Sequence, residues 1–311
     1  MQKHQLTYDV IIAAFNSEAY IGEAIRSVLN SSRQPSRIIV VDDASGDQTV
    51  EVASSFGGVE VLQNPENQER SRTRNRGIRE SNADFVQLLD ADDLLHPDKT
   101  AIQLDFMENN PQVDVAFGDV WLFGDGEWPG EKRIYPEKLD VTEQLIRKNI
   151  FALHSLLFRR SFFERFGYFD SSLPISEDRE LYLRSMINGA KWHYTNGAEV
   201  YYRQHDGGTI RSRQYESAYY NAVPVRKHRR ELAGLSNGRY KQVISDSLRT
   251  LARNANIAGR PMREVITLID EAVEISNTPR MTQNRWYQLV ESFFGPKSLE
   301  RLLRLRFRFG R

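Results

Sequence analysis

The sequence contains no cysteine, no long apolar run and no net charge. Without cysteine, the chain has neither disulfides nor thiolate metal sites. Lys and Arg together number 42, as do Asp and Glu, so the charge balance does not support nucleic-acid binding. No run reaches the ~18–20 apolar residues that span a bilayer, and residues 1–8 lack the apolar core of a secretory signal. We therefore expect a cytoplasmic protein, either soluble or bound at the inner face of the cell membrane.

Strand-like and helix-like patterns alternate over the first hundred residues. Residues 9–15, 37–41, 59–62 and 84–89 are short, largely apolar segments, as expected of strands covered on both faces. This alternation predicts an α/β fold, with a mostly parallel central sheet flanked by crossover helices. In such sheets, ligands bind beyond the carboxyl ends of the strands. The same edge should therefore carry the functional site.

The middle of the chain is mixed and its last third is helical. Residues 113–117 and 154–158 are predicted as strands, and residues 191–194 and 199–202 as two further short strands. Helical patterns interrupted by glycine and proline begin at about residue 214. The predicted domains are residues 1–210 and a helical C-terminal extension, residues 211–311. The extension could cover the first domain, shape an acceptor site or mediate homo-oligomerisation.

Three carboxylates, Asp90, Asp92 and Asp93, come directly after the predicted strand 84–89. Like charges this close repel one another unless a cation or a group of donors neutralises them. Carboxylate oxygens suit Mg²⁺ or Mn²⁺, which take one or two protein carboxylates together with phosphate oxygens. The alternative is a solvated acidic turn that caps the next helix.

Three other charged clusters each have two interpretations. Asp42 and Asp43 could bind the imide of uracil or cap a helix. The four arginines at positions 70, 72, 74 and 76 could contact a nucleotide's phosphates or form a solvent-facing basic face. Glu177 and Asp178 could supply a general base, or could only favour a helix N-terminus through its dipole.

The order of these motifs resembles glycosyltransferase family 2. The resemblance lies in residues 10–16, 40–49, 73–77, 89–93 and 176–178, and extends over roughly residues 8–205. Each motif is weak alone, but five in the right order are specific. The resemblance implies a GT-A fold, a nucleotide-diphosphate-sugar donor, a Mn²⁺ or Mg²⁺ cofactor, and single-displacement transfer with inversion at the anomeric carbon.

The resemblance also implies roles for individual residues. The donor nucleotide would be bound by a set from the first three motifs and the acidic loop: Ala13, Phe15, Asn16, Asp43, Arg74, Asp90 and Asp92. Within that set, Asp43 would bind uracil N3, the feature that favours UDP over other nucleotides. The metal would be held by Asp92, Asp93 and His205, and Asp178 would be the catalytic base with Glu177 beside it.

Two features depart from the family pattern. Ala13 and Phe15 stand where the family usually has proline and tyrosine, and Phe15 can stack on a base but has no hydroxyl to donate. The segment 283–286 is one residue short of the Q-x-x-R-W motif of processive members. We therefore predict a non-processive enzyme that adds one sugar per encounter to a glycan or lipid-linked acceptor, in polysaccharide or glycoconjugate synthesis.

The last residues, 298–311, form a basic amphipathic pattern. Leucines and phenylalanines gather on one side of a helical projection and arginines on the other. Such a helix can lie in the surface of an anionic bilayer, or it can pack on the protein with its basic face in solvent. Peripheral membrane contact through this helix would bring the enzyme to a lipid-linked acceptor.

Other classes of protein are also conceivable. A nucleotidyltransferase needs a glycine-rich loop to hold a triphosphate, and a dinucleotide-dependent oxidoreductase needs G-x-G-x-x-G after its first strand. Residues 15–18 provide neither. A catalytically inactive sugar-nucleotide-binding or scaffold protein is the remaining alternative, and the intact carboxylates at positions 90, 92, 93 and 178 argue against it.

Overall fold

The structure is a computed structural model, and it describes residues 6–124, 128, 130–205, 214–276, 295, 297 and 298; for 214–219 and 221 only the backbone is described. The chain forms two compact units. Unit 1 comprises residues 1–139, 151–181 and 188–206, and unit 2 comprises residues 140–150, 182–187 and 207–311. The predicted single boundary near residue 210 stays a prediction. The segment 283–286 and the basic tail beyond Ser298 lie outside the described residues.

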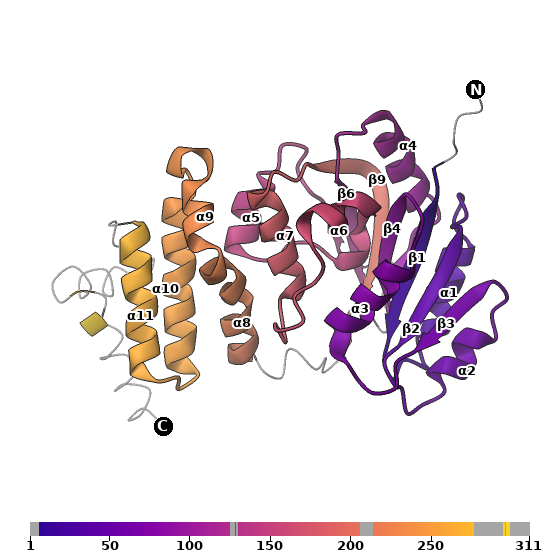
Figure 1. Ribbon diagram of the computed structural model, residues 1–311, viewed down its shortest axis with the longest axis horizontal. Helices are drawn as coiled ribbons and strands as arrows, with labels where there is room; N and C mark the ends of the chain where they lie inside the picture. The colour runs from indigo at the N-terminus through magenta and orange to yellow at the C-terminus, as the bar shows by residue number, and fades with distance from the viewer. Residues whose placement is uncertain are drawn as a thin grey trace. The chain divides into compact units, whose positions relative to one another are not determined.

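Unit 1 is built on a nine-stranded sheet in the order β3-β2-β1-β4-β8-β6-β9-β5, with β7 paired to β6 (Figure 1). The strands are β1 Tyr8–Ala14, β2 Arg37–Asp42, β3 Val59–Gln63, β4 Phe85–Asp90, β5 Leu94–Leu95, β6 Val115–Phe123, β7 Lys132–Arg133, β8 Leu156–Arg159 and β9 Trp192–Arg203. The first four strands in chain order are parallel to one another, and β8 pairs antiparallel with both β4 and β6. The predicted α/β fold with a flanked central sheet is confirmed.

Helices cover this sheet and connect its strands. Those of unit 1 are α1 Ile21–Leu29, α2 Thr49–Ser54, α3 Glu69–Glu80, α4 Lys99–Asn109, the short 3₁₀ helix η1 Leu153–Ser155, α6 Arg160–Phe166 and the first residues of α7 Glu177–Ile187. α1 forms because its apolar residues recur at helical spacing. Ile21, Ala24, Ile25 and Val28 are fully buried, while Leu29 is partly exposed.

The close approach of α3 to the sheet depends on a glycine. α3 packs against β1 and β2 (Figure 1). A Cβ atom built at Gly77 would lie 2.4 Å from Cγ2 of Ile11 and 3.1 Å from Cγ2 of Val41. Any larger residue would therefore push the helix away from the sheet. The glycine of the 73–77 motif is explained by packing rather than by ligand binding.

The segments 191–194 and 199–202 belong to one strand, so the prediction of two separate strands is wrong. β9 runs without interruption and pairs in parallel with β6, with an irregularity between Phe117 and Asp119. A Cβ at Gly118 would lie 1.8 Å from the carbonyl oxygen of Ala198, so the two strands touch at this point. The sequence suggested a break because polar residues and Gly197 lie in the middle of β9.

Unit 2 is helical in its described residues. It contains α5 Val141–Arg147, α8 Gln214–Lys227, α9 Arg229–Gly234, the 3₁₀ helix η3 Leu235–Gly238, α10 Lys241–Ile257, α11 Met262–Ile275 and the end of α7. α10 and α11 lie side by side (Figure 1) and share a small apolar core: Leu251, Ala252, Ala255, Val265, Leu268 and Ile269. Of the described helices, none is both long and apolar enough to cross a bilayer.

Candidate active site

The strand register brings the two acidic clusters of the N-terminal half to one edge of the sheet. Ala13 of β1 is the partner of Val41 in β2 and of Asp90 in β4, and Ala14 is the partner of Asp42. Because these strands are parallel, the loops that follow them leave from the same edge. The structure therefore places the candidate site at the carboxyl ends of β1, β2 and β4.

Backbone strain is concentrated at this edge. Of the six described non-glycine residues with a positive φ angle, Asn16 follows β1, Ala44 follows β2, and Glu69 and Ser176 stand at the starts of α3 and α7. Such conformations cost energy and persist only where the surrounding contacts hold them. Asn16 shows how they are held. Its Oδ1 accepts from the backbone N–H of Gly46 at 2.9 Å, which ties the loop after β1 to the loop after β2.

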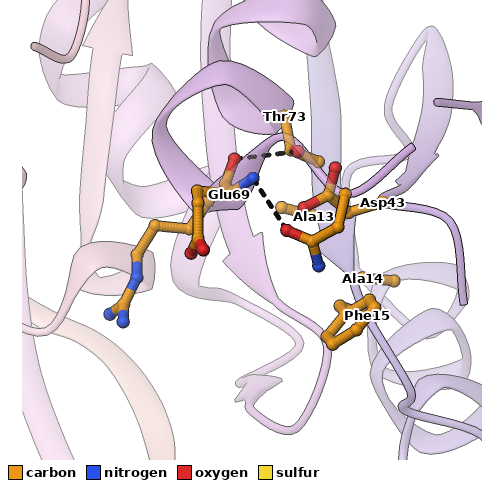
Figure 2. A pocket seen from close by; sticks show the side chains of 8 residues that line it. Ala13, Ala14, Phe15, Asp43, Glu69 and Thr73 are labelled. Carbon is orange, nitrogen blue, oxygen red and sulfur yellow. Dashed lines mark hydrogen bonds between the residues drawn. The ribbon is translucent and has the colours of Figure 1, made fainter. Parts of the chain in front are cut away.

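A pocket of about 210 Å³ opens at the ends of β1 and β2 (Figure 2). It is lined by residues of both strand ends and of the start of α3: Ala13, Ala14, Phe15, Asp43, Asn67, Glu69, Arg70 and Thr73. Phe15 is 47% exposed, an unusual exposure for a phenylalanine. Its ring is available for stacking against a planar ligand.

Asp43 is buried in the wall of this pocket and is held from one side. Its Oδ1 accepts two hydrogen bonds, from Asn64 Nδ2 at 2.7 Å and from the backbone N–H of Gln68 at 2.9 Å. Within the described part of the chain, no hydrogen bond ends on its Oδ2. Asn64 is itself fixed, since its Nδ2 also donates to Thr73 Oγ1 at 3.1 Å. One carboxylate oxygen is anchored and the other remains for a ligand.

Arg74 connects the acidic loop after β4 with the start of α7. Its Nη2 lies 2.6 Å from Asp90 Oδ1, and its Nη1 lies 2.8 Å from Glu177 Oε1. Burial acts to lower the pKa of Arg74, but the charges of Asp90 and Glu177 raise it above the ordinary arginine value. Burial likewise acts to raise the pKa of Asp90, and Arg74 brings it below its ordinary value. Arg74 and Asp90 therefore remain ionised at neutral pH.

The neighbours of Arg74 in α3 fix the same region. Asn75 makes two hydrogen bonds to the backbone of Phe169, donating to its carbonyl at 2.9 Å and accepting from its N–H at 3.0 Å. The hydroxyl of Thr73 donates to the carbonyl of Glu69 at 3.0 Å, as the dashed line in Figure 2 shows. The motif 73–77 thus joins the pocket at the ends of β1 and β2, the acidic loop and the segment that leads to α7.

The carboxylates Asp92 and Asp93 of the loop after β4 differ in exposure: Asp92 is partly exposed to solvent and Asp93 is buried. Asp92 is 39% exposed at its side chain, and its Oδ2 lies 2.8 Å from Nε2 of His205, which is 33% exposed. Asp93 is buried; its Oδ1 accepts from the backbone N–H of Arg203 at 2.8 Å, and its Oδ2 lies 3.1 Å from Nδ1 of His154. Burial raises the pKa of Asp93, with His154 acting in the opposite direction. The metal role predicted for Asp93 stays a prediction.

The structure thus brings the predicted metal residues Asp92 and His205 into direct contact, although they lie 113 positions apart in sequence. No group of three or more potential metal-ligating side chains occurs among the described residues. A carboxylate and an imidazole are nevertheless suitable ligands for Mn²⁺, and phosphate oxygens of a bound nucleotide normally complete such a site. The donor set of Asp92 and His205 therefore fits a divalent cation.

Glu177 and Asp178 begin α7 and have different surroundings. Glu177 is buried against Arg74, whereas Asp178 is half-buried. The charge of Asp178 also contributes to the raised pKa of Arg74, so this carboxylate lies close to the same guanidinium. Ser176, just before the helix, has φ 68°, and this turn determines how the two carboxylates leave the chain.

Several residues of this region were not predicted as site residues. Asn64 and Gln68 hold Asp43 but belong to no motif, so only the tertiary contacts reveal them. His154 is fully buried beneath the acidic loop and carries no sequence signal apart from being a histidine. By contrast, Arg70 is one of the four arginines predicted as possible phosphate contacts; it lines the pocket, is 41% exposed and lies 3.9 Å from Glu177. Arg74 is already paired, whereas Arg70 lines the pocket with an exposed side chain.

Comparison with known proteins identifies the class. The family model described as Glycosyl transferase family 2 matches residues 9–167, which is more than half of the 311-residue chain. The chain therefore belongs to glycosyl transferase family 2 and is a glycosyltransferase. The matched range includes the ends of β1, β2 and β4 and all of α3.

Individual relatives agree with this assignment. An uncharacterized glycosyltransferase of Methanocaldococcus jannaschii is 26% identical over 230 residues, covering 70% of this chain and 78% of the relative. The succinoglycan biosynthesis protein ExoU of Rhizobium meliloti is 27% identical over 203 residues, 59% of this chain and 58% of ExoU.

Solved structures share the fold. S. aureus TarS in complex with UDP-GlcNAc superposes with a TM-score of 0.63 at 18% identity, covering 98% of this chain and 93% of that one. The mannosyltransferase PcManGT of Pyrobaculum calidifontis, in complex with GDP-Man and Mn²⁺, gives a TM-score of 0.58 at 16% identity, covering 97% and 88%. At these identities the likeness concerns the GT-A fold.

Proposed function

We propose that this glycosyltransferase is inverting, metal-dependent and non-processive, and that it moves a sugar from a UDP-sugar to a hydroxyl of a glycan or lipid-linked acceptor. The observation that carries the proposal is the Arg74 bridge. By binding Asp90 and Glu177 at 2.6 and 2.8 Å, it joins the strand end beside the pocket to the helix that bears Asp178. This contact supports the proposal that nucleotide-side and acceptor-side groups belong to one site.

The pocket beside Asp43 is the proposed nucleotide site. A uracil can stack on Phe15 and donate its N3–H to the unoccupied Oδ2 of Asp43. Ala13 leaves room for the base, and Arg70 at the rim can bind the diphosphate. The UDP-GlcNAc and UDP named for the TarS structures support a uridine donor, and GDP-Man in PcManGT makes GDP-sugars the necessary comparison.

Asp92 and His205 are the proposed metal ligands. When bound there, Mn²⁺ or Mg²⁺ would supply positive charge that stabilises the leaving diphosphate. Asp93 joins the loop to the backbone of Arg203, and the Nε–H of Arg203 donates to the carbonyl of Asp92 at 2.9 Å. The protein thereby holds the metal-side loop in one position.

Asp178 is the proposed catalytic base. Its carboxylate accepts the proton of the acceptor hydroxyl while the acceptor oxygen forms a bond to the anomeric carbon of the donor sugar. The bond from that carbon to the phosphate oxygen breaks, and the nucleoside diphosphate leaves with the electron pair. Attack opposite to the leaving group inverts the anomeric configuration. Glu177, already paired with Arg74, orients the start of α7 rather than accepting the proton.

The proposal of a lipid-linked acceptor rests on the sequence of the C-terminal tail, which lies outside the described residues. The basic amphipathic pattern of residues 298–311 would bring the enzyme to an anionic membrane that carries a lipid-linked acceptor. A variant that ends at residue 297 should lose sedimentation with anionic liposomes. If it sedimented as well as the full chain, the membrane proposal would be withdrawn and the transferase proposal would stand.

A thermal-shift screen with and without Mn²⁺ tests the donor. UDP-sugars should raise the melting temperature of the full chain, because a ligand at 100 times its Kd stabilises the native state by about 2.7 kcal/mol. GDP-mannose and dTDP-glucose are the comparison ligands. A chain that none of these nucleotides stabilises, with either metal, would contradict the proposal.

Asp178→Asn tests the base. We expect donor hydrolysis or transfer to fall by about 10²–10⁴-fold while UDP still stabilises the protein. Asp98→Asn, which alters an exposed carboxylate just before α4, is the matched control and should retain wild-type activity. Equal activity of the Asp178→Asn variant and wild type would rule out this base.

A further inference from the structure

Tyr202 is an exposed aromatic residue beside the acidic loop, and it has no role in the proposed transfer. It lies near the end of β9, directly before Arg203, whose backbone N–H donates to Asp93. Its side chain is 39% exposed, whereas most large apolar side chains of β9 and β6 are covered. Its hydroxyl has no hydrogen-bond partner among the residues that the structure describes. A solvent-facing ring with an unused donor requires an explanation.

The ring is supported from beneath. It stacks on the imidazole of His154, with 6.0 Å between ring centroids and 11° between planes. His154 is fully buried and lies 3.1 Å from Asp93, so its position is fixed by the acidic loop. The stack on a buried, ion-paired histidine therefore restrains the orientation of the Tyr202 ring, and such restraint favours ligand binding.

The surroundings of Tyr202 include the three carboxylates of the acidic loop. Its pKa is raised to about 12, first by burial and then by the charges of Asp93, Asp90 and Asp92. The hydroxyl consequently stays protonated at neutral pH and can donate a hydrogen bond. The next residue, Arg203, donates to Asp93 and to the carbonyl of Asp92, and His154 beneath the ring contacts Asp93, so the ring lies beside the acidic loop.

We infer that Tyr202 is a sugar-binding residue whose ring packs against the C–H face of a pyranose and whose hydroxyl donates to one of its oxygens. A pyranose presents an apolar face and a polar rim, which matches an aromatic ring that carries a hydroxyl. The pyranose is either the sugar of the donor or the terminal sugar of the acceptor. The inference rests on the proposed function, since it assigns a role within the same site.

Two substitutions separate the contribution of the Tyr202 ring to binding from that of its hydroxyl. Tyr202→Phe keeps the stack on His154 and removes the donor, and Tyr202→Leu removes both. Tyr201→Leu is the matched control: Tyr201 is the neighbour on the same strand, and its ring packs with Phe123, Trp128 and His96 instead. Melting temperatures verify that each variant is folded. Calorimetry with Mn²⁺ then gives Kd for UDP and for UDP-GlcNAc, and initial rates give KM for the acceptor.

All variants should bind UDP with a Kd within about twofold of wild type, because the uridine pocket does not include Tyr202. If the ring binds the donor sugar, Tyr202→Leu should weaken UDP-GlcNAc by about tenfold and Tyr202→Phe by about threefold. If it binds the acceptor sugar, the same factors should appear in the acceptor KM. Tyr201→Leu should change neither.

Unchanged UDP-GlcNAc affinity and acceptor KM in a folded Tyr202→Leu variant would overturn the inference. Should that variant not fold, the Tyr202→Phe variant decides, and unchanged constants there would equally overturn it. A wild-type chain that binds neither UDP nor UDP-GlcNAc would instead contradict the proposed UDP-sugar donor, so the two failures are distinguishable.

Discussion

Replacing Arg74 by methionine is expected to destabilise unit 1 by about 3–5 kcal/mol at neutral pH. The substitution keeps most of the apolar stem and removes the charge that binds Asp90 and Glu177. Breaking a buried ion pair by removing one partner usually costs that much, because the other charge is left buried and unpaired. The side chain of Glu177 is only 4% exposed, so Glu177 accounts for most of the lost stability. The side chain of Asp90 is 30% exposed and can regain some hydration.

The pH dependence of this effect has a definite sign. Arg74 lowers the folded-state pKa of Asp90. Its stabilising contribution is therefore fully present above the unfolded value of about 3.9 and is lost as the pH falls through the folded value. In the variant, Asp90 lacks the positive charge that lowers its pKa. The difference in unfolding free energy between wild type and Arg74→Met should consequently stay constant above about pH 4 and narrow as the pH is lowered below about 4.

Urea unfolding of the full chain, followed by tryptophan fluorescence, measures this difference at each pH. Arg72→Met is the matched control, because Arg72 is exposed on the same helix, two residues away. It should change the unfolding free energy by no more than about 0.5 kcal/mol. If Arg74→Met destabilised no more than this control, or if the gap widened at low pH, the electrostatic account of the bridge would be refuted.

Three further predictions concern other parts of the same unit. Gly77→Ala should destabilise the protein by about 1–3 kcal/mol in thermal unfolding, because its methyl group would lie 2.4 Å from Ile11; unchanged stability would show that α3 can shift freely. Asp43→Asn should weaken UDP binding by about tenfold in calorimetry without loss of melting temperature, and equal affinity would argue against a uracil contact. Burial lowers the pKa of Lys99 well below its ordinary value, so the folded chain releases a proton that the unfolded chain keeps. Wild-type stability should therefore rise between about pH 8 and pH 10, by at most about 1.4 kcal/mol per pH unit, and Lys99→Met should remove that rise; parallel pH profiles of the two proteins would contradict it.

Much of the fold was predictable because its local signals agree with the tertiary structure. The first four strands are continuous apolar segments, and each of their predicted bounds lies within one residue of the observed bound. Short or irregular elements were not predictable. β5 and β7 contain two residues each, and β9 contains polar residues and a glycine in its middle. These strands exist because neighbouring strands supply their hydrogen bonds, which no local pattern reveals.

The candidate site was predictable as a set of motifs but not as a geometry. Sequence order alone places Asp43 and Asp90 after neighbouring strands, and parallel register then brings them to one edge. Within each motif, neighbouring residues make different contacts, and these contacts depend on the tertiary structure. Asp92 faces solvent beside His205, whereas the adjacent Asp93 is buried against His154.

The sequence by itself determined the α/β class, the position of the candidate site at the strand ends and the family, because apolar periodicity and motif spacing are local properties of the chain. Only the tertiary structure decided what each charged residue contacts. Arg74 became a bridge rather than an open phosphate contact because residues 90 and 177, far apart in sequence, meet at its guanidinium. Tyr202 became a candidate sugar contact because β9 returns beside the loop after β4 and a buried histidine supports its ring. Such contacts depend on long-range packing, and a single sequence carries no record of them.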